Sequence, residues 1–271
     1  MNTGYSLADQ IVAIVLWACF YEGRSRMAVF ARPIRQLFPR VTIALRRLGG
    51  MKVDIQLGNQ ADLVIFEEIF IGNVYPFSLM SFVPDAVVDC GGFAGYFTLL
   101  AAAEYPLAKL IVFEPNSMNY RRMRKNFELN RLSVDSRREA VSNAAGLRRF
   151  HENGCGSRLE GDESGASSVA VQAIRLSEFV GNLQSERILL KLDVEGEEKV
   201  ILPDLIPRLP QRCALFVEWH HRERDFAEVE EQLRSEGFFV KRCRSRFQGY
   251  EDFVYLDVFA LRDAESDSAS R

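Results

Sequence analysis

The sequence predicts an α/β fold built on a mostly parallel, doubly wound sheet of seven strands, preceded by an N-terminal helical extension. Three observations support this class. Short apolar runs alternate with segments of helical periodicity between residues 86 and 217. The first of these runs ends in a glycine turn that opens a helix. Two strand-like segments near the end of the chain, residues 238–240 and 253–261, favour an antiparallel pair at the sheet edge.

Composition narrows the class of protein. With 271 residues, 48% of them hydrophobic, the chain can bury one large core, and we predict an extension (1–50), a main domain (51–262) and a polar tail (263–271). The net charge of −3 disfavours a nucleic-acid partner. The five cysteines are odd in number and lack C-x-x-C spacing, so neither a disulfide framework nor a zinc site is indicated. This cysteine usage favours the cytoplasm.

The predicted extension is basic, with seven arginines against two acids. Its apolar stretch, residues 11–20, is about half as long as a bilayer requires, and no basic segment precedes it as in a signal peptide. Residues 24–48 mix arginine with apolar side chains, which favours helices that pack on the core with their arginines in water. A peripheral membrane contact, a protein partner and a homo-oligomer stay open as alternatives.

The first elements of the main domain come before the glycine turn. Residues 53–57 alternate with period two, as in a strand, and residues 62–70 carry apolar positions at helical spacing. Tyr75 stands just before the first core strand. There it could contribute to a lid or a substrate wall.

The glycine turn carries the most informative motif. A buried strand (86–88) passes through Asp89 into CGGFAG at residues 90–95, and a helix is predicted over 96–104. Glycines let a backbone approach a ligand closely, and a helix start offers unpaired N–H groups. The bland alternative is that these glycines only permit close helix packing.

The following strand, residues 110–113, ends on Glu114, which is placed to accept hydrogen bonds from a ribose diol. The complete βαβ unit therefore predicts a cofactor that contains a nucleoside. A dinucleotide fingerprint is disfavoured because Cys90 stands where its first glycine should be. The spacing D-x-G-x-x-x-G instead resembles the first motif of class I S-adenosylmethionine methyltransferases.

The middle of the chain continues the alternation. A second helix is predicted over 116–130 with Asn116 as its N-cap, and the third strand is predicted to end at 140–141. Glu139 stands where an acid could meet an adenine amino group. The segment 151–168 is rich in Gly, Ser and acids, which predicts a long loop.

The later strands gather the candidate catalytic residues. The fourth core strand (188–192) is followed by Asp193 and Glu195, and the fifth (214–217) is followed by Glu218 and His220. Because the carboxyl ends of parallel strands meet at one crevice, we expect these side chains to share one acidic mouth. Three further features are predicted: a helix over 197–202 that Pro203 ends or kinks, a capping box at Asp225 and Glu228, and a helix end at Gly237.

Taken together, the motifs make residues 60–260 resemble the FkbM family of S-adenosylmethionine-dependent methyltransferases. The resemblance implies a Rossmann-like class I methyltransferase fold. Two positions depart from the family pattern, because Gly92-Phe93 stand where the family has Ala-Asn, and Ser177 where it has Asp. The matching segments are VVDCGGFAGYFTLLAA, VFEPN, NFELN, EAVSN, VQAIRLSEFV, LLKLDVEGEE and LFVEWH, of which LKLDVEGEE is the most specific.

The resemblance implies S-adenosylmethionine as cofactor and a hydroxyl of a sugar, a glycan or a secondary metabolite as acceptor. It also implies that Asp89, Gly91 and Gly95 cradle the methionine and ribose, and that Glu114 holds the ribose hydroxyls. The full set of predicted cofactor contacts is Asp89, Gly91, Gly92, Phe93, Gly95, Glu114, Pro115, Asn116, Glu139, Ala140 and Asp193. The predicted substrate contacts are Tyr75, Ser157, Glu218 and His220.

The acidic mouth supplies the candidate general bases for an O-methyl transfer. His220 is favoured because its unperturbed pKa lies nearest neutrality, and Asp193 or Glu195 could serve if neighbouring acids raise their pKa. A Mg²⁺ ion held by the mouth is an alternative, but we favour a metal-free site. The rival functions are an NAD-linked dehydrogenase or epimerase and a non-catalytic adaptor that binds a partner or membrane through the basic N-terminus.

Overall fold

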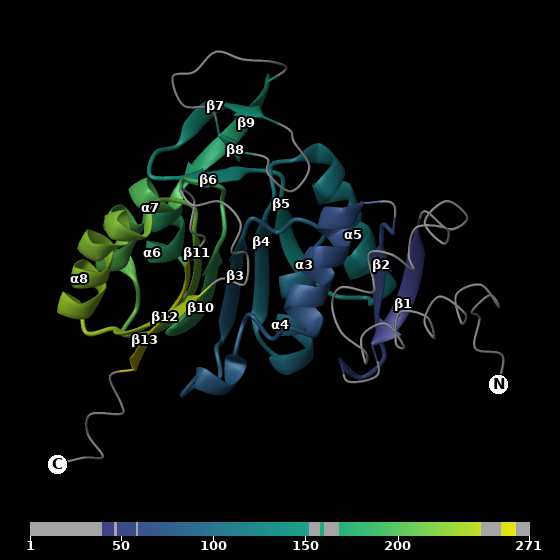
Figure 1. The fold of residues 1–271 in the computed structure, drawn as a ribbon, viewed down its shortest axis with the longest axis horizontal. Helices are drawn as coiled ribbons and strands as arrows, with labels where there is room; N and C mark the ends of the chain where they lie inside the picture. Colours follow the sequence, from purple (N-terminus) through teal and green to yellow (C-terminus); the bar gives the residue numbers. More distant parts are fainter. Residues whose placement is uncertain are drawn as a thin grey trace.

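The central sheet of the computed structural model has seven strands in the order β12-β13-β11-β10-β3-β4-β5 (Figure 1). The structure describes residues 40–45, 48–57, 59–151, 158–159, 168–244 and 256–263. Neighbours from β11 to β5 are parallel, and β13 is antiparallel to both β11 and β12. The predicted fold class is thus confirmed. The strands are β3 (Ala86–Cys90), β4 (Lys109–Phe113), β5 (Val134–Arg137), β10 (Arg187–Leu192), β11 (Arg212–Trp219), β12 (Phe239–Arg244) and β13 (Leu256–Asp263).

The order of strands creates a switch point between β3 and β10. From β3 the chain winds outward through β4 to β5, and it then returns to the other side of β3 to build β10 and β11. Ligands of doubly wound sheets bind at such a point, beyond the carboxyl ends of the strands. The glycine turn and the segment that begins at Asp193 both lie at this end of the sheet.

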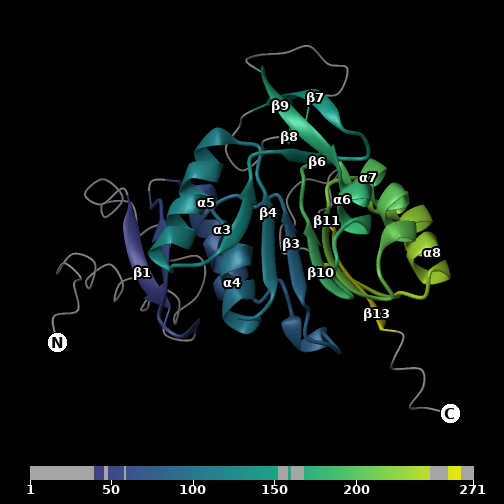
Figure 2. The same ribbon diagram turned by 180° about the vertical axis from the view of Figure 1, so that it is seen from behind.

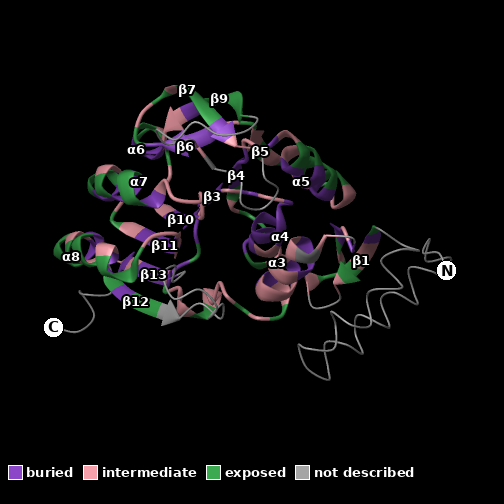
Figure 3. Cartoon of the chain, turned by 45° about the horizontal axis from the view of Figure 1, so that its top comes forward, coloured by how far each residue is buried: buried purple, intermediate pink, exposed green. Residues whose placement is uncertain are grey.

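Helices cover both faces of the central sheet. Successive residues of β3 face the two hydrophobic cores on opposite faces of the sheet. Val87 belongs to the core that includes side chains of α3 and α4, and Val88 to the core that includes side chains of α6 and α7. The rear view shows α5 and α6 on opposite sides of the sheet (Figure 2). Buried residues concentrate in the central strands and on the helix sides that face them (Figure 3). The helices are α3 (Gln60–Phe70), α4 (Tyr96–Glu104), α5 (Ser117–Leu129), α6 (Leu176–Gly181), α7 (Glu198–Leu205) and α8 (Ala227–Ser235), with short 3₁₀ turns at Phe77–Leu79, Ile206–Arg208 and Glu223–Phe226.

A separate four-stranded sheet lies beyond the carboxyl end of the central one (Figure 1). The third core strand, β5, ends at Arg137, so the expectation that this strand ends at 140–141 is wrong. Ala140 instead pairs with Ala173, because the chain leaves the central sheet after Arg137. The strands of the small sheet are β6 (Ala140–Ser142), β7 (Gly146–His151), β8 (Arg158–Leu159) and β9 (Ser168–Arg175).

The boundary predicted at residue 50 falls inside an antiparallel hairpin. β1 (Val41–Leu45) pairs with β2 (Met51–Ile55), so the described residues before 51 include a strand and not only helix. Gly49 and Gly50, with φ of 65° and 85°, close the hairpin. The segment 11–20 lies outside the described residues. No helix in the described part of the chain is long and apolar enough to cross a membrane.

Local sequence signals fix several helix ends. Asn116 caps α5 as predicted, its side chain accepting the N–H groups of Met118 and Asn119. Gly237, at φ 83°, ends the α8 segment as predicted. The capping box at Asp225 is wrong, because a 3₁₀ turn fills Glu223–Phe226 and α8 has no side-chain cap. Pro203 lies inside α7, which runs on to Leu205.

Candidate functional site

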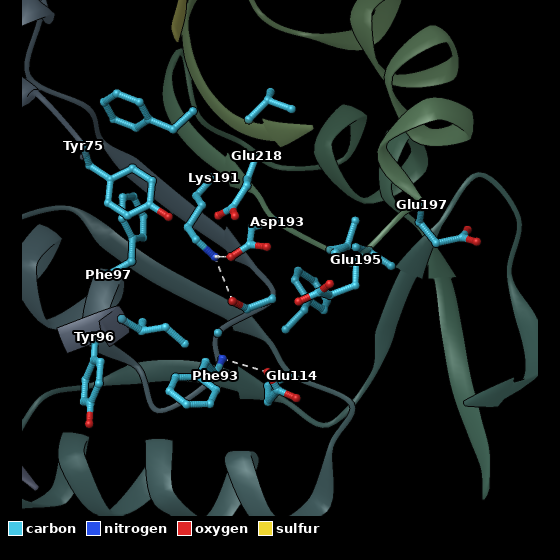
Figure 4. Close-up of a pocket in the computed structure, with 18 of the residues that line it drawn as sticks. Tyr75, Phe93, Tyr96, Phe97, Glu114, Lys191, Asp193, Glu195, Glu197 and Glu218 are labelled. Atoms are coloured by element: carbon cyan, nitrogen blue, oxygen red, sulfur yellow. Dashed lines mark hydrogen bonds and ion pairs between the residues drawn. The ribbon is translucent and has the colours of Figure 1, made fainter. Parts of the chain in front are cut away.

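A cavity opens beyond the carboxyl ends of β3, β4, β10 and β11, at the switch point of the sheet (Figure 4). One side is formed by the glycine turn and Glu114, and the opposite side by residues from the ends of β10 and β11. The small sheet contributes Val141, Phe150 and Leu159. The predicted site residues that line the cavity are Tyr75, Gly91, Gly92, Phe93, Glu114, Pro115, Glu139, Ala140, Asp193, Glu195 and Glu218.

Four predicted residues do not reach the cavity wall, and one cannot be placed. Asp89, Gly95, Asn116 and His220 are not among the described residues that line the cavity. Asp89 and Asn116 are buried, and they contact Lys191 and Glu114, respectively, two residues that line the cavity. Ser157 lies outside the described residues.

The glycine turn owes its residue types to packing against the protein as well as to the cavity. Gly91 has φ 86°, and a Cβ there would stand 1.8 Å from the carbonyl oxygen of Asp193. Only a glycine lets the turn approach the segment after β10 so closely. Gly95, at φ 81°, precedes the first residue of α4, and a Cβ there would meet the ring of Phe127 at 2.7 Å. Close packing therefore accounts for both glycines, and contact of Gly91 with a ligand stays a prediction, which its place in the cavity wall allows.

Glu114 fastens the turn to the start of α5. Its Oε2 accepts the N–H of Phe93 at 2.7 Å, and its Oε1 accepts the N–H of Asn116 at 2.8 Å. Burial raises the pKa of Glu114 to about 8, although these two hydrogen bonds oppose the shift. Each carboxylate oxygen has a second lone pair, so the residue can still accept a hydrogen bond from a diol in the cavity.

A buried lysine joins the two halves of the site, and the sequence reasoning gave it no role. The Nζ of Lys191 donates to the Gly91 carbonyl at 2.8 Å and lies 3.3 Å from Asp89 and 3.1 Å from Asp193. Asp89 in turn accepts a hydrogen bond from the Thr98 hydroxyl at 2.7 Å. Lys191 therefore ties the cofactor turn on β3 to the acidic segment after β10.

The acidic mouth forms as predicted from the positions of its residues at the carboxyl ends of β10 and β11. The Nε2 of His220 lies 3.7 Å from a carboxylate oxygen of each of Asp193, Glu195 and Glu218. Its Nδ1 lies 3.0 Å from Glu198, a carboxylate that is fully buried at the start of α7. Glu198 also accepts the N–H of Val194 at 2.9 Å, so one carboxylate orients both the ring and the turn.

These neighbours change the charge of the histidine. Burial alone would lower the pKa of His220, but the hydrogen bond and charge of Glu198 and the charges of Asp193 and Glu218 raise it to about 10. The reason for choosing His220 as the base, a pKa near neutrality, therefore does not hold. Burial raises the pKa of Glu195 to about 7, and the charge of Asp193 adds to that rise while His220 opposes it.

The mouth also has a geometry that a metal ion could use. Ligand atoms of Asp193, Glu195 and His220 all lie within 4.8 Å of one another. Carboxylates and imidazole are ordinary ligands of divalent ions.

Comparison with known proteins places the chain in a family. The family described as the methyltransferase FkbM domain matches residues 89–240. A curated relative, Methyltransferase 1 of Beauveria bassiana, is 30% identical over 65% of this chain and 80% of its own length. The family match together with the doubly wound sheet makes the chain a Rossmann-like methyltransferase. The chain belongs to the FkbM methyltransferase family. The predicted cofactor, S-adenosylmethionine, is thereby confirmed.

Solved structures that align with the chain do so at low sequence identity. Methyltransferase FkbM from Methylobacillus flagellatus aligns with a TM-score of 0.45 and 12% identity, covering 72% of this chain and 48% of that one. TYW2 of M. jannaschii, solved in complex with AdoMet, aligns with a TM-score of 0.45 and 13% identity over 83% of this chain and 87% of that one.

Proposed function

We propose that the protein transfers a methyl group from S-adenosylmethionine to a hydroxyl of a sugar, a glycan or a secondary metabolite. The observation that carries the proposal is the position of Glu195, a carboxylate that lines the same cavity as the glycine turn and Glu114; burial also raises its pKa to about 7. A base that removes the proton of an attacking group works best when its pKa lies near the working pH. A screen of labelled methyl transfer to hydroxylated glycans and polyketides tests the proposal.

The residues divide the work between the two sides of the cavity. When bound, S-adenosylmethionine supplies an electrophilic methyl group at its sulfonium sulfur. Glu114, Phe93 and the Gly91 turn hold the nucleoside side. On the other side Glu195 accepts the hydroxyl proton as the new C–O bond forms and the S–C bond breaks. His220 stays protonated beside Glu195 and acts as a positioning residue.

Removing the Glu114 carboxylate is expected to weaken cofactor binding. Glu114→Ala should cost about 1.5–3 kcal/mol of binding free energy for S-adenosylhomocysteine, because it deletes hydrogen bonds to an ionisable group and releases the Phe93 N–H. Calorimetric titration of both proteins measures this, with NAD as a second titrant that should bind far more weakly. Unchanged affinity in a folded variant, or tighter binding of NAD, would contradict the assignment.

Chelation is expected to leave turnover nearly unchanged. The three carboxylates Asp193, Glu195 and Glu218 each lie 3.7 Å from the Nε2 of His220. Neighbouring carboxylates, Glu198 foremost, raise the pKa of His220 against the effect of its burial, so a protonated His220 can offset the charge of the three without a metal ion. The measurement is the methyl-transfer rate after exhaustive EDTA treatment and after addition of Mg²⁺ or Mn²⁺. Loss of activity with EDTA and its recovery with Mg²⁺ would show that the mouth binds a metal.

A further inference from the structure

One wall of the cavity is made by two cross-strand pairs of β11 and β13. Phe216 stands directly opposite Phe259, and Glu218 directly opposite Asp257. Residues two apart on a strand project to the same face, so both pairs face the cavity, and all four residues line it. Tyr75 packs against this wall, with its ring centroid 5.4 Å from that of Phe216.

The acidic pair is unfavourable for the protein by itself. Like charges directly opposite on neighbouring strands destabilise a sheet. The side chain of Asp257 forms no hydrogen bond or ion pair with any described residue, although its backbone pairs with both neighbouring strands. For Glu218 the nearby cation is His220 at 3.7 Å, which Asp193 and Glu195 share. The charge of this wall is thus only partly offset by the protein's own cations.

The other buried cation near this wall, Lys191, is paired with other carboxylates. Lys191 forms its ion pairs with Asp89 and Asp193. Lys191 is therefore not paired with Glu218 or Asp257 in the described part of the chain. A cation inside the cavity would offset the charge of Glu218 and Asp257, which stand opposite each other on its wall.

A separate feature of the wall indicates which kind of cation fits. The ring centroids of Phe216 and Phe259 lie 5.2 Å apart, and their rings adjoin the two carboxylates along the same strands. A hard metal ion gains nothing from aromatic carbon, since it is held by oxygen ligands. Organic ammonium groups, in contrast, bind well where aromatic rings and carboxylates meet, because the rings attract the cation and cover its alkyl groups.

We propose that the methyl acceptor carries a basic nitrogen, and that Glu218 and Asp257 bind its ammonium group against Phe216 and Tyr75. This inference rests on the proposed function, because it names the class of acceptor for the same cavity. The ammonium anchor holds the molecule at the β11–β13 wall, and the hydroxyl of the molecule is then presented toward Glu195. An amino alcohol is the simplest molecule that carries both groups.

The test uses a charged probe and its neutral isostere. Choline and 3,3-dimethyl-1-butanol have the same shape and hydroxyl, but only choline is charged. Titration into the full-length protein saturated with S-adenosylhomocysteine, followed by ligand-observed NMR, should show choline binding about tenfold more tightly, on the scale of a cation–π contact with a nearby carboxylate. Glu218→Gln with Asp257→Asn should remove this difference, whereas Asp135→Asn, at the far edge of the sheet, should keep it.

The comparison of the two probes on the wild-type protein requires no variant. If the double variant does not fold, the single variant Asp257→Asn replaces it. Equal affinity of the two probes for the wild type, or an undiminished preference for choline in the folded variants, would overturn the ammonium site. Saturation with S-adenosylhomocysteine is measured in the same series. Failure of that step would overturn the proposed function itself, whereas charge-independent probe binding would overturn only the acceptor class.

Discussion

Glu195→Gln is expected to lower the turnover number for methyl transfer by about 10²–10⁴-fold, the usual contribution of a general base. The amide keeps the shape of the side chain but cannot take the hydroxyl proton. Cofactor affinity should stay nearly unchanged, because the ion-pair partner of Glu195 in the described structure is His220, and not a residue of the glycine turn. Single-turnover kinetics with saturating S-adenosylmethionine measures the effect, and Glu178→Gln, on the surface of α6, is the matched control.

The pH profile separates Glu195 from His220 as the base. A base works in its deprotonated form, so the wild-type rate should rise as pH increases through about 7, the pKa of Glu195. His220→Gln removes a positive charge that lowers this pKa, so the rising limb should move to higher pH. If His220→Gln instead abolished turnover at every pH while Glu195→Gln kept it, the histidine would be the base that its ordinary pKa suggests.

The sequence was sufficient where signals were local. The helix α4 follows its predicted range of 96–104, and Asn116 caps α5, because a glycine turn, a following proline and an N-cap residue act within a few positions. The strand β1 was missed because its partner β2 lies across a hairpin. The third strand was predicted to end too late in the sequence, because a short apolar segment such as 140–141 does not show which of two sheets it joins.

For the site, strand order was enough to gather residues but not to assign their charge. The clustering of Asp193, Glu195 and Glu218 was predictable, because it follows from their positions at the carboxyl ends of parallel strands. The role of Asp257 depends on the register of a returning antiparallel strand, which no local motif encodes. The protonation of His220 depends on Glu198, a helix residue whose buried orientation the sequence does not show.

Lys191→Met is expected to lower the free energy of unfolding by about 3–5 kcal/mol, the cost of removing one partner of a buried ion pair. The lysine is almost fully buried, and its loss would leave Asp89 inside the protein without a cation. Methionine fills most of the same volume, so packing alone predicts a small effect. Urea unfolding of both proteins measures the difference. Lys199→Met, which removes an exposed pair with Asp225, should change stability by less than about 1 kcal/mol.

The loss should also depend on pH in a direction that identifies the buried charge. Burial already raises the pKa of Asp89, with Lys191 opposing that shift, so removing the lysine raises the folded-state pKa further. A carboxyl whose folded pKa exceeds its unfolded value favours the folded state when protonated, and this stability is lost as pH rises above the unfolded value near 3.9. The deficit of Lys191→Met should therefore be smaller at pH 5 than at pH 8. A deficit that is the same at both values would mean that lost packing, and not an uncompensated Asp89, destabilises the variant.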